Sequence, residues 1–253
     1  MPRRAREKSP TGIYHVMMRG INRQSIFEDN EDRQKIIEIF SRYQETNCYR
    51  LFAYCLMDNH IHILLQEIKE PIAQSIKRIS SSYVLWFNKK YGRCGHLFQE
   101  RFKSEVVEND SYFLTVLRYI HNNPVKAKIV ADLYDYKWSS YGQYMGRGNI
   151  IDKEYVLRMF KNIPGEAIEL FNKYSRELNA DSCLELEENK VVISDDRLRE
   201  AIKLLFGIEA IRIGNEPKER QDLIFKKLKH LNGVSIRQIA RITGVSQTRI
   251  WKA

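Results

Sequence analysis

The chain has 253 residues, of which 43% are hydrophobic and 29% are charged, and 42 Lys and Arg against 32 Asp and Glu give a formal net charge of +10. This composition excludes a disordered chain, a collagen and a disulfide-rich miniprotein, and the length suffices for one large core and a small second domain. No apolar run approaches the roughly 20 residues that span a bilayer. The basic first ten residues lack the apolar stretch of a secretory signal. Four scattered cysteines without a C-x-x-C pair fit a reducing cytoplasm, so we expect a cytoplasmic protein with no membrane partner.

The charge lies in two basic blocks separated by an acidic stretch. Residues 1–150 carry 23 basic and 16 acidic side chains, residues 151–215 carry 10 and 13, and residues 216–253 carry 9 and 3. Basic blocks attract polyanions, and the neutralisation of phosphates supplies the sequence-independent part of nucleic-acid binding. The pattern favours a nucleic-acid partner, although basic proteins that bind no nucleic acid also exist.

Hydrophobic periodicity predicts alternating strands and helices in the first 125 residues. The strands are expected over residues 13–18, 49–57 and 60–66 and within 93–107. The helices are expected over residues 29–46 and 71–90 and from 110 or 111 onward. Asp58-Asn59 is a turn signal between two strands, Asp110 or Ser111 caps the third helix, and Pro124 stops it. This order predicts an α+β fold, an antiparallel sheet backed by helices.

Two histidines in the return strand of the predicted hairpin, His60 and His62, are separated by one residue. Side chains at i and i+2 of a strand share a face, so both imidazoles point the same way while Ile61 points to the opposite face. Two such imidazoles are a natural pair of metal ligands. A His-x-His triplet often has no function, so this pattern needs support from elsewhere in the chain.

Tyr119 and Asn123 are spaced i and i+4 on the third predicted helix and therefore share one of its faces. The Asn123 carbonyl oxygen is a candidate third ligand, and a site of mixed nitrogen and oxygen donors suits Mg²⁺ or Mn²⁺. A tyrosine that attacks a phosphodiester forms a covalent phosphotyrosine and conserves the bond energy, so a strand can be cut and rejoined. The spacing alone does not favour Tyr119 over Tyr112, and a tyrosine in this pattern can equally be a core residue.

Five short motifs in register resemble the single-tyrosine HUH transposases, in particular those associated with repetitive extragenic palindromes in bacteria. The matching stretches are residues 14–23, 54–65, 95–104, 118–125 and 138–141, within roughly residues 10–145. The resemblance implies a ferredoxin- or RRM-like HUH sheet, His60 and His62 as metal ligands and Tyr119 as the nucleophile. It places Asn123 where related transposases have a third ligand, usually glutamine. Asp58 departs from the proline that the family usually has before Asn-His.

The family's substrate is single-stranded DNA, often beside a hairpin. The resemblance therefore gives the basic residues of these motifs a role in binding phosphates. The candidates for this role are Arg19, Arg23, Arg101 and Lys103. Tyr14, Phe98 and Phe102 are candidates for stacking on bases, and the alternative for all three is a place in the core.

The last twenty residues resemble a helix-turn-helix, with residues 220–231 as a third helix. Gly244 makes the turn, Ala240 is small where the helices cross, and Ser246 caps the second helix. Arg237 and Arg241 on the first helix are expected to meet phosphates. Gln247, Thr248 and Arg249 open the second helix, the end that reads base edges in double-stranded DNA. The alternative is a generic helical hairpin.

These observations predict three regions: an HUH domain over residues 1–148, an acidic helical connection over 149–215 and a helix-turn-helix domain over 216–253. The predicted function is a DNA strand transferase that forms a 5′-phosphotyrosine and releases a 3′-OH end. A DNA-binding regulator on a non-cutting scaffold and a metal-dependent DNA hydrolase remain alternatives. Relaxases and replication initiators share the HUH chemistry, but no second catalytic tyrosine or helicase segment favours them. We expect a nucleoid-associated monomer or homodimer.

Overall fold

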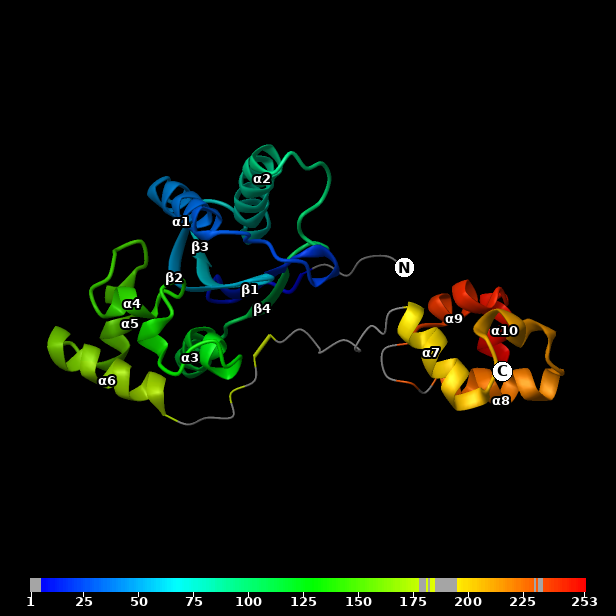
Figure 1. The fold of residues 1–253 in the computed structure, drawn as a ribbon. Helices are drawn as coiled ribbons and strands as arrows, with labels where there is room; N and C mark the ends of the chain where they lie inside the picture. Colours follow the sequence, from blue (N-terminus) through cyan, green and yellow to red (C-terminus); the bar gives the residue numbers. More distant parts are fainter. Residues whose placement is uncertain (1–5, 178–180, 182, 185–194, 230, 232–233) are drawn as a thin grey trace. The chain divides into compact units, whose positions relative to one another are not determined.

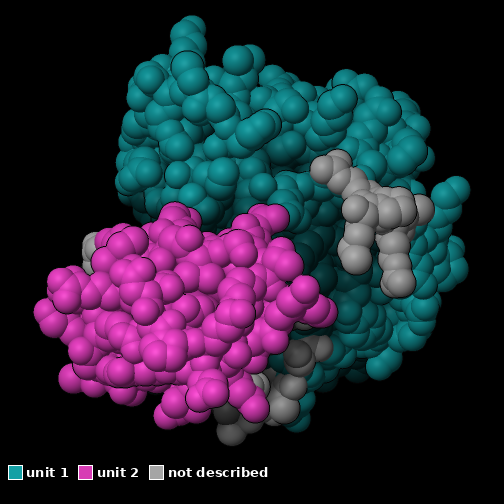
Figure 2. All heavy atoms as spheres, turned by 90° about the vertical axis from the view of Figure 1, so that its right-hand side faces the viewer, with its two compact units in different colours: residues 1–184 teal, residues 185–253 magenta. Residues whose placement is uncertain are grey.

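A computed structural model describes residues 6–253 of the chain, except 178–180, 182, 185–194, 230 and 232–233. The chain divides into two compact units, residues 1–184 and residues 185–253 (Figures 1 and 2). The first unit confirms the predicted α+β fold. Across the described ranges, no helix is both long enough and apolar enough to cross a bilayer.

A four-stranded antiparallel sheet in the order β2-β3-β1-β4 is the centre of the first unit. Its strands are β1 (Ile13–Arg19), β2 (Tyr49–Met57), β3 (His60–Glu67) and β4 (Lys103–Val106). The β2–β3 hairpin forms as predicted, since two residues separate the strands and Met57 pairs with His60. The register of β1 against β3 places Arg19 opposite His60 and Met17 opposite His62.

Helices cover both faces of this sheet, which explains why its central strands are apolar on both sides. Figure 1 shows α1 (Asn30–Glu45) and α2 (Ile72–Lys90) on one face and α3 (Asp110–Lys126) on the other. The remaining helices of this unit are η1 (Ile21–Arg23), η2 (Leu133–Asp135), α4 (Tyr141–Tyr144), α5 (Lys153–Phe160) and α6 (Pro164–Arg176). Alternation along β1 and β3 therefore points His15, His60 and His62 toward α3.

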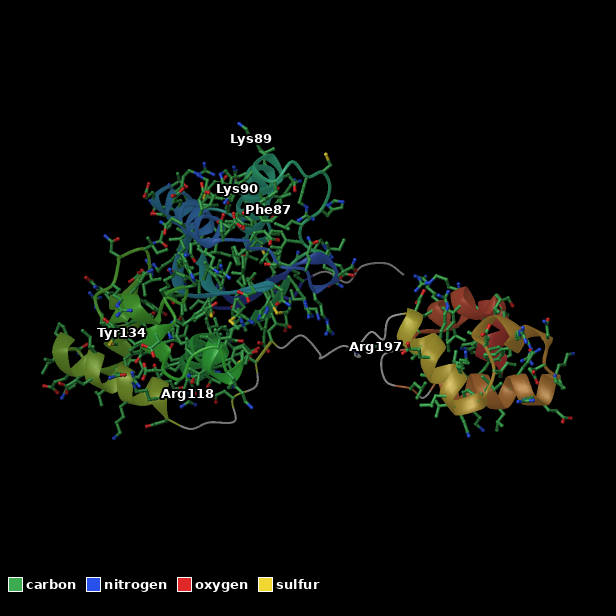
Figure 3. All side chains as sticks on the ribbon, in the orientation of Figure 1. Phe87, Lys89, Lys90, Arg118, Tyr134 and Arg197 are labelled. Carbon is green, nitrogen blue, oxygen red and sulfur yellow. The ribbon has the colours of Figure 1, made fainter. Side chains whose placement is uncertain are left out.

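A capping box fixes the start of α1, and ion pairs attach this helix to α2. Asp29 and Asp32 form a reciprocal capping box at the start of α1. The ammonium of Lys90, at the end of α2 and labelled in Figure 3, lies 2.8 Å from Asp29 and 2.9 Å from the buried Asp32. This charge pairing ties the two helices together on the face of the sheet opposite α3.

The structure corrects both predicted ends of α3. Its N-cap is Asn109, an extended residue whose side chain accepts the N–H of Tyr112, rather than Asp110 or Ser111. Pro124 does not stop the helix, which continues to Lys126. A proline near the end of a helix removes one hydrogen bond, and here Ala127 still donates to the Asn123 carbonyl, so the last turn closes around it.

The compact units also differ from the three regions predicted from sequence. Residue 148 is not a boundary, because α6 packs Phe171 against Tyr144 of α4 at a centroid distance of 4.3 Å. Asp152 donates its N–H to the carbonyl of Leu51 in β2. The second unit includes α7, which the prediction placed in the connecting region, because Leu198 and Ile202 are buried in its core.

The second unit is a small helical bundle with its own core. Its helices are α7 (Asp195–Phe206), η3 (Ala210–Asn215), α8 (Lys218–Lys229), α9 (Ile236–Thr243) and α10 (Gln247–Lys252). Ile224, Phe225, Ile239 and Ile250 are buried between these helices. Gly244, with φ of +72°, ends α9 in the left-handed region that glycine adopts without strain, and a short turn then leads into α10.

Candidate active site

The two histidines of the His-x-His motif lie side by side on the sheet face that α3 covers. The ring centroids of His60 and His62 are 5.0 Å apart. The Nδ1 of His60 lies 2.6 Å from the Oδ1 of Asn59, and the Nδ1 of His62 lies 2.9 Å from the Nε2 of His15. Each ring engages a neighbour through Nδ1, which leaves its Nε2 as the nitrogen for coordination.

Burial keeps both imidazoles neutral. Desolvation, with smaller contributions from His15 and His60, lowers the pKa of His62 well below its ordinary value. Desolvation, followed by the charge of Arg19, lowers the pKa of His60 to about 4. Neutral imidazole is the form that binds a metal ion, so this environment suits a ligand pair at neutral pH.

Tyr119 of α3 packs against the same histidines. Its ring centroid is 5.6 Å from that of His62 and 5.8 Å from that of His15, both edge to face, and the residue is 5% exposed. The ammonium of Lys126, two turns further along α3, lies 5.0 Å from the centroid of the Tyr119 ring. The sequence alone did not distinguish Tyr119 from Tyr112, and the packing places Tyr119 beside the His-x-His pair.

Asn123 lies one turn after Tyr119 and is half-buried. Its Nδ2 donates to the Tyr119 carbonyl at 2.9 Å, so the amide turns Oδ1 away from the helix backbone. No three His, Cys, Asp or Glu side chains gather into a metal cage in the portion of the chain that the structure describes. Two neutral imidazoles offer nitrogen donors and the Asn123 amide offers an oxygen donor, and donors of these types are compatible with a divalent cation.

Two polar residues of this face, His15 and Glu105, were missed by sequence reasoning. His15 is fully buried, and its Nδ1 lies 3.7 Å from a carboxylate oxygen of Glu105, which is opposite it in the β1–β4 register. Desolvation lowers the pKa of His15 although Glu105 opposes the shift. Strand alternation could have assigned a face to His15. Only the pairing of β1 with β3 and β4 brings it to His62 and Glu105.

The predicted phosphate-binding residues gather around the end of β1. Arg19 lies directly opposite His60, is half-buried, and has an Nε without a hydrogen-bond partner in the described part of the chain. Lys103 opposes Met17 on the outer strand, and Arg101 is exposed in the preceding loop. Arg23 follows in η1. A Cβ at Gly20 would lie 2.3 Å from a backbone oxygen, so the tight turn after Arg19 requires glycine.

The aromatic residues predicted to stack on bases divide between core and surface. Tyr14 is 3% exposed, which makes it a core residue and corrects that expectation. Phe98 and Phe102 are half-buried and line a groove of about 770 Å³ between α2 and residues 96–102. The Arg6 guanidinium lies 3.7 Å above the ring of Phe102, and Lys77 and Arg101 also line this groove.

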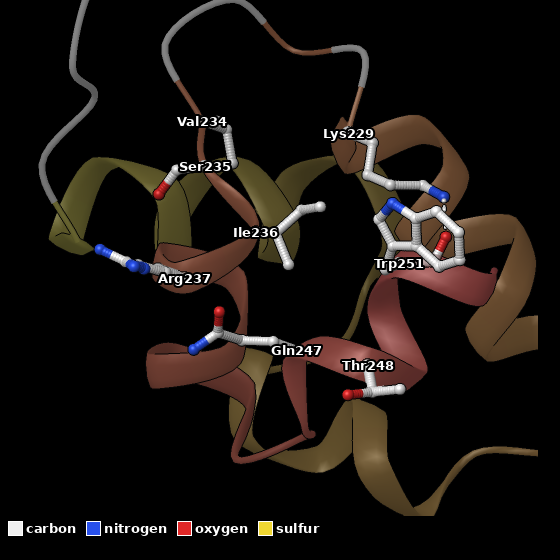
Figure 4. A pocket seen from close by; sticks show the side chains of 8 residues that line it. All are labelled: Lys229, Val234, Ser235, Ile236, Arg237, Gln247, Thr248 and Trp251. Atoms are coloured by element: carbon white, nitrogen blue, oxygen red, sulfur yellow. Dashed lines mark hydrogen bonds between the residues drawn. The ribbon is translucent and has the colours of Figure 1, made fainter. Parts of the chain in front are cut away.

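In the second unit, the five predicted DNA contacts fall into two groups. Arg237, Gln247 and Thr248 line a groove of about 700 Å³ beside the exposed Trp251 (Figure 4). Arg241 instead pairs with Asp195 of α7 at 2.6 Å, and Arg249 pairs with Asp222 of α8 at 2.5 Å. These two arginines attach α9 and α10 to the rest of the bundle.

Comparisons with known proteins bear on the first unit. The family model described as "Transposase IS200 like" matches residues 9–123. A Haemophilus influenzae protein described as a REP-associated tyrosine transposase is 30% identical over 122 residues, which cover 42% of this chain and 68% of that protein. A solved REP-associated tyrosine transposase bound to a REP hairpin has a TM-score of 0.50 and 18% identity, over 60% of this chain and 94% of that one. At this identity the structural match shows the fold alone.

Proposed function

The chain belongs to the REP-associated tyrosine transposases, and from that membership we propose that it cleaves and rejoins single-stranded DNA beside a hairpin through a covalent bond to Tyr119. The observation that carries this proposal is the packing of the Tyr119 ring against His62 at 5.6 Å, beside a second imidazole. The structural relative with a bound REP hairpin suggests a hairpin of this kind as the substrate.

The proposed reaction is an exchange of one phosphodiester for another. The Tyr119 oxygen attacks the scissile phosphorus, the bond from phosphorus to the 3′ oxygen breaks, and that oxygen takes up a proton and leaves as a 3′-OH. The 5′ phosphate stays bound to Tyr119. A 3′-OH end that attacks this phosphotyrosine restores a continuous strand and regenerates the phenol.

His60, His62 and Asn123 are the residues that would hold Mg²⁺ or Mn²⁺, which would draw negative charge from the phosphate. Arg19 supports the same phosphate from the next strand, since it faces His60 and its Nε lacks a partner in the described residues. A phenol has an ordinary pKa of about 10. The ammonium of Lys126, 5.0 Å from the centroid of the Tyr119 ring, is the candidate cation beside the attacking phenol.

The groove between α2 and residues 96–102 is the proposed path for the bases that flank the scissile bond. It adjoins the active site because Gln99 donates its N–H to the carbonyl of Arg19. Phe98 and Phe102 offer partly exposed rings for stacking, while Arg6 and Arg101 supply positive charge at the rim. We assign double-stranded DNA to the α9–α10 pair of the second unit, through Arg237, Gln247 and Thr248.

A trapping assay tests this function. A hairpin oligonucleotide from a repetitive extragenic palindrome, with single-stranded flanks, is labelled at either its 5′ or its 3′ end and incubated with the protein and Mn²⁺. We expect the 3′-labelled part to migrate with the protein on a denaturing gel and the 5′-labelled part to appear as a free fragment.

The variants Tyr119→Phe and Tyr112→Phe separate the two candidate tyrosines of α3. The adduct should disappear in Tyr119→Phe and persist in Tyr112→Phe. Cleavage without an adduct in both variants would point to a hydrolase. Binding without cleavage in the wild-type protein, across a panel of hairpins, would point to a regulator.

A further inference from the structure

A line of three ionisable side chains, two of them buried, crosses the sheet beneath α3. Glu105 of β4, His15 of β1 and His62 of β3 lie on three adjacent strands. His15 directly opposes Glu105, and it is the diagonal neighbour of His62, which opposes Met17. His15 is 0% exposed and His62 is 2% exposed. Burial of an imidazole costs free energy unless a hydrogen-bond partner compensates it. The buried position of His15 therefore indicates a specific role for this residue.

The atoms in this line determine which nitrogens carry protons. The Nδ1 of His15 lies 3.7 Å from the Glu105 carboxylate, which is beyond hydrogen-bond distance, and it has no hydrogen-bond partner among the described residues. The negative charge of the carboxylate nevertheless favours a proton on the nearer ring nitrogen. In the neutral ring, the Nε2 of His15 then holds a lone pair. This Nε2 lies 2.9 Å from the Nδ1 of His62, so His62 must donate from Nδ1. The lone pair of His62 is thereby placed on Nε2.

His60 also carries its proton on Nδ1, but a different residue imposes this tautomer. Asn59 donates its Nδ2 to the carbonyl of Arg23, which turns Oδ1 toward His60. Because Oδ1 can only accept, the Nδ1 of His60 carries the proton in the 2.6 Å contact. Both motif histidines are therefore set to present Nε2, and two unrelated partners impose the same tautomer.

We propose that Glu105 and His15 are positioning residues that hold His62 in the Nδ1–H tautomer, so that its Nε2 is ready to bind a divalent cation. This inference rests on the proposed function, in which His60 and His62 hold the ion. Neither positioning residue touches the substrate in this scheme. Glu105 is itself fixed by the N–H of Leu184 at 2.9 Å.

Two variants at residue 15 separate the hydrogen bond from the packing. In His15→Gln the amide oxygen can accept from His62 while the amide NH₂ faces Glu105. In His15→Phe the ring volume is retained but the acceptor is lost. Glu105→Gln, which keeps an acceptor for His15, and Glu105→Leu, which does not, form a second matched pair.

The first readout is the tautomer of His62 in the metal-free protein, measured by long-range ¹H–¹⁵N correlation of the histidine rings. We expect the Nδ1–H form of His62 in the wild-type protein and in His15→Gln. His15→Phe and Glu105→Leu should populate the Nε2–H form. A residue that only fills space would leave this tautomer unchanged.

The second readout is the affinity for Mn²⁺, measured by calorimetry. Loss of an outer-shell partner typically weakens metal binding by about 10- to 100-fold. We expect a loss of this size in His15→Phe and an affinity within a few-fold of wild type in His15→Gln. If His15→Phe does not fold, as judged by circular dichroism, the Glu105 pair decides the question with the same two readouts.

The outcomes distinguish this inference from the proposed function. The positioning role would be overturned if His15→Phe and Glu105→Leu both kept the wild-type tautomer and the wild-type Mn²⁺ affinity, and the metal site would then stay intact. If His15→Phe is unfolded, the same result in Glu105→Leu alone would overturn it. Unchanged Mn²⁺ affinity in His62→Ala would instead overturn the metal site of the proposed function.

Discussion

The ring of Tyr119 on α3 lies 5.6 Å from the ring of His62 on β3, edge to face, although 57 positions separate the two residues in the sequence. This contact joins a candidate nucleophile to a candidate metal ligand on one face of the sheet.

Arg19 is predicted to bind the phosphate at the active site. Each phosphate contact on single-stranded DNA contributes about 0.7 to the slope of log affinity against log salt concentration. The variant Arg19→Ala should therefore lower this slope by about that amount, measured by fluorescence anisotropy of a labelled hairpin with single-stranded flanks.

The matched control for this prediction is Arg158→Ala. Arg158 is an exposed arginine of α5 that pairs with Glu154 of the same helix. Equal salt slopes in the wild-type protein and Arg19→Ala would show that Arg19 does not contact phosphate.

Asn123 is predicted to be the third metal ligand through its Oδ1. Asn123→Ala removes this oxygen and should weaken Mn²⁺ binding by about 10-fold or more, at least as much as the loss of an outer-shell partner. Asn123→Gln keeps an amide oxygen and should retain more of the affinity. Calorimetric titration of the DNA-free protein measures both, and identical affinities in wild type and Asn123→Ala would exclude Asn123 as a ligand.

In the second unit, Gln247 is proposed to read DNA, whereas Arg241 is paired with a carboxylate of the same bundle. Gln247→Ala should lower the affinity for the preferred double-stranded site by about 1–3 kcal/mol, because a base-edge contact is worth this much. Arg241→Ala should instead lower the melting temperature, since it breaks the ion pair with Asp195.

Anisotropy with duplex DNA and thermal melting by circular dichroism test this division. Adduct formation on a single-stranded hairpin serves as the control, and neither variant should change it. A Gln247→Ala variant with wild-type duplex affinity would contradict the role of α10 in recognition.

His121 is predicted to make stability depend on pH. Its ring is fully buried, and its Nε2 lies 2.9 Å from the Ser140 hydroxyl. Burial lowers the pKa of His121 to about 3, below the value of about 6.5 in the unfolded chain. Between these values the unfolded state binds the additional proton, so the free energy of unfolding falls as the pH falls from about 6.5 toward 3, by at most about 1.4 kcal/mol per pH unit.

The variant His121→Phe should remove this contribution. Urea denaturation between pH 7 and pH 4 should show a shallower loss of stability in His121→Phe than in the wild-type protein. His15 and His62 titrate in both proteins and cancel in the comparison. Tyr144→Phe, which changes a neighbour of His121 that does not titrate in this range, should keep the wild-type slope, and an equal slope in His121→Phe would contradict the prediction.

Sequence reasoning predicted the elements of the first unit well, because strand alternation and helical periodicity are local signals. The His60 and His62 pair shares one face for that reason. The contact of His62 with His15 depends on the register of β1 against β3, which no local pattern encodes. The predicted end of α3 was wrong because a proline near the end of a helix removes only one hydrogen bond, and the last turn closes around Pro124.

The boundary at residue 148 was wrong for a related reason. Glycines 142, 146 and 148 are typical of a linker. Phe171 of α6, more than 20 positions further along the chain, is nevertheless buried against Tyr144, which lies between these glycines. In the second unit, periodicity could place α9 and α10, but it could not show that Arg241 and Arg249 pair with carboxylates.

The most direct test of the central claim is to identify the residue that carries the DNA. Trypsin cleaves after Arg118 and Lys126 and releases residues 119–126, in which Tyr119 is the single tyrosine. The trapped adduct is treated with nuclease, digested with trypsin and analysed by mass spectrometry. We expect a nucleotide attached through its 5′ phosphate to this peptide, whereas the same modification on a peptide that contains another tyrosine would contradict the account.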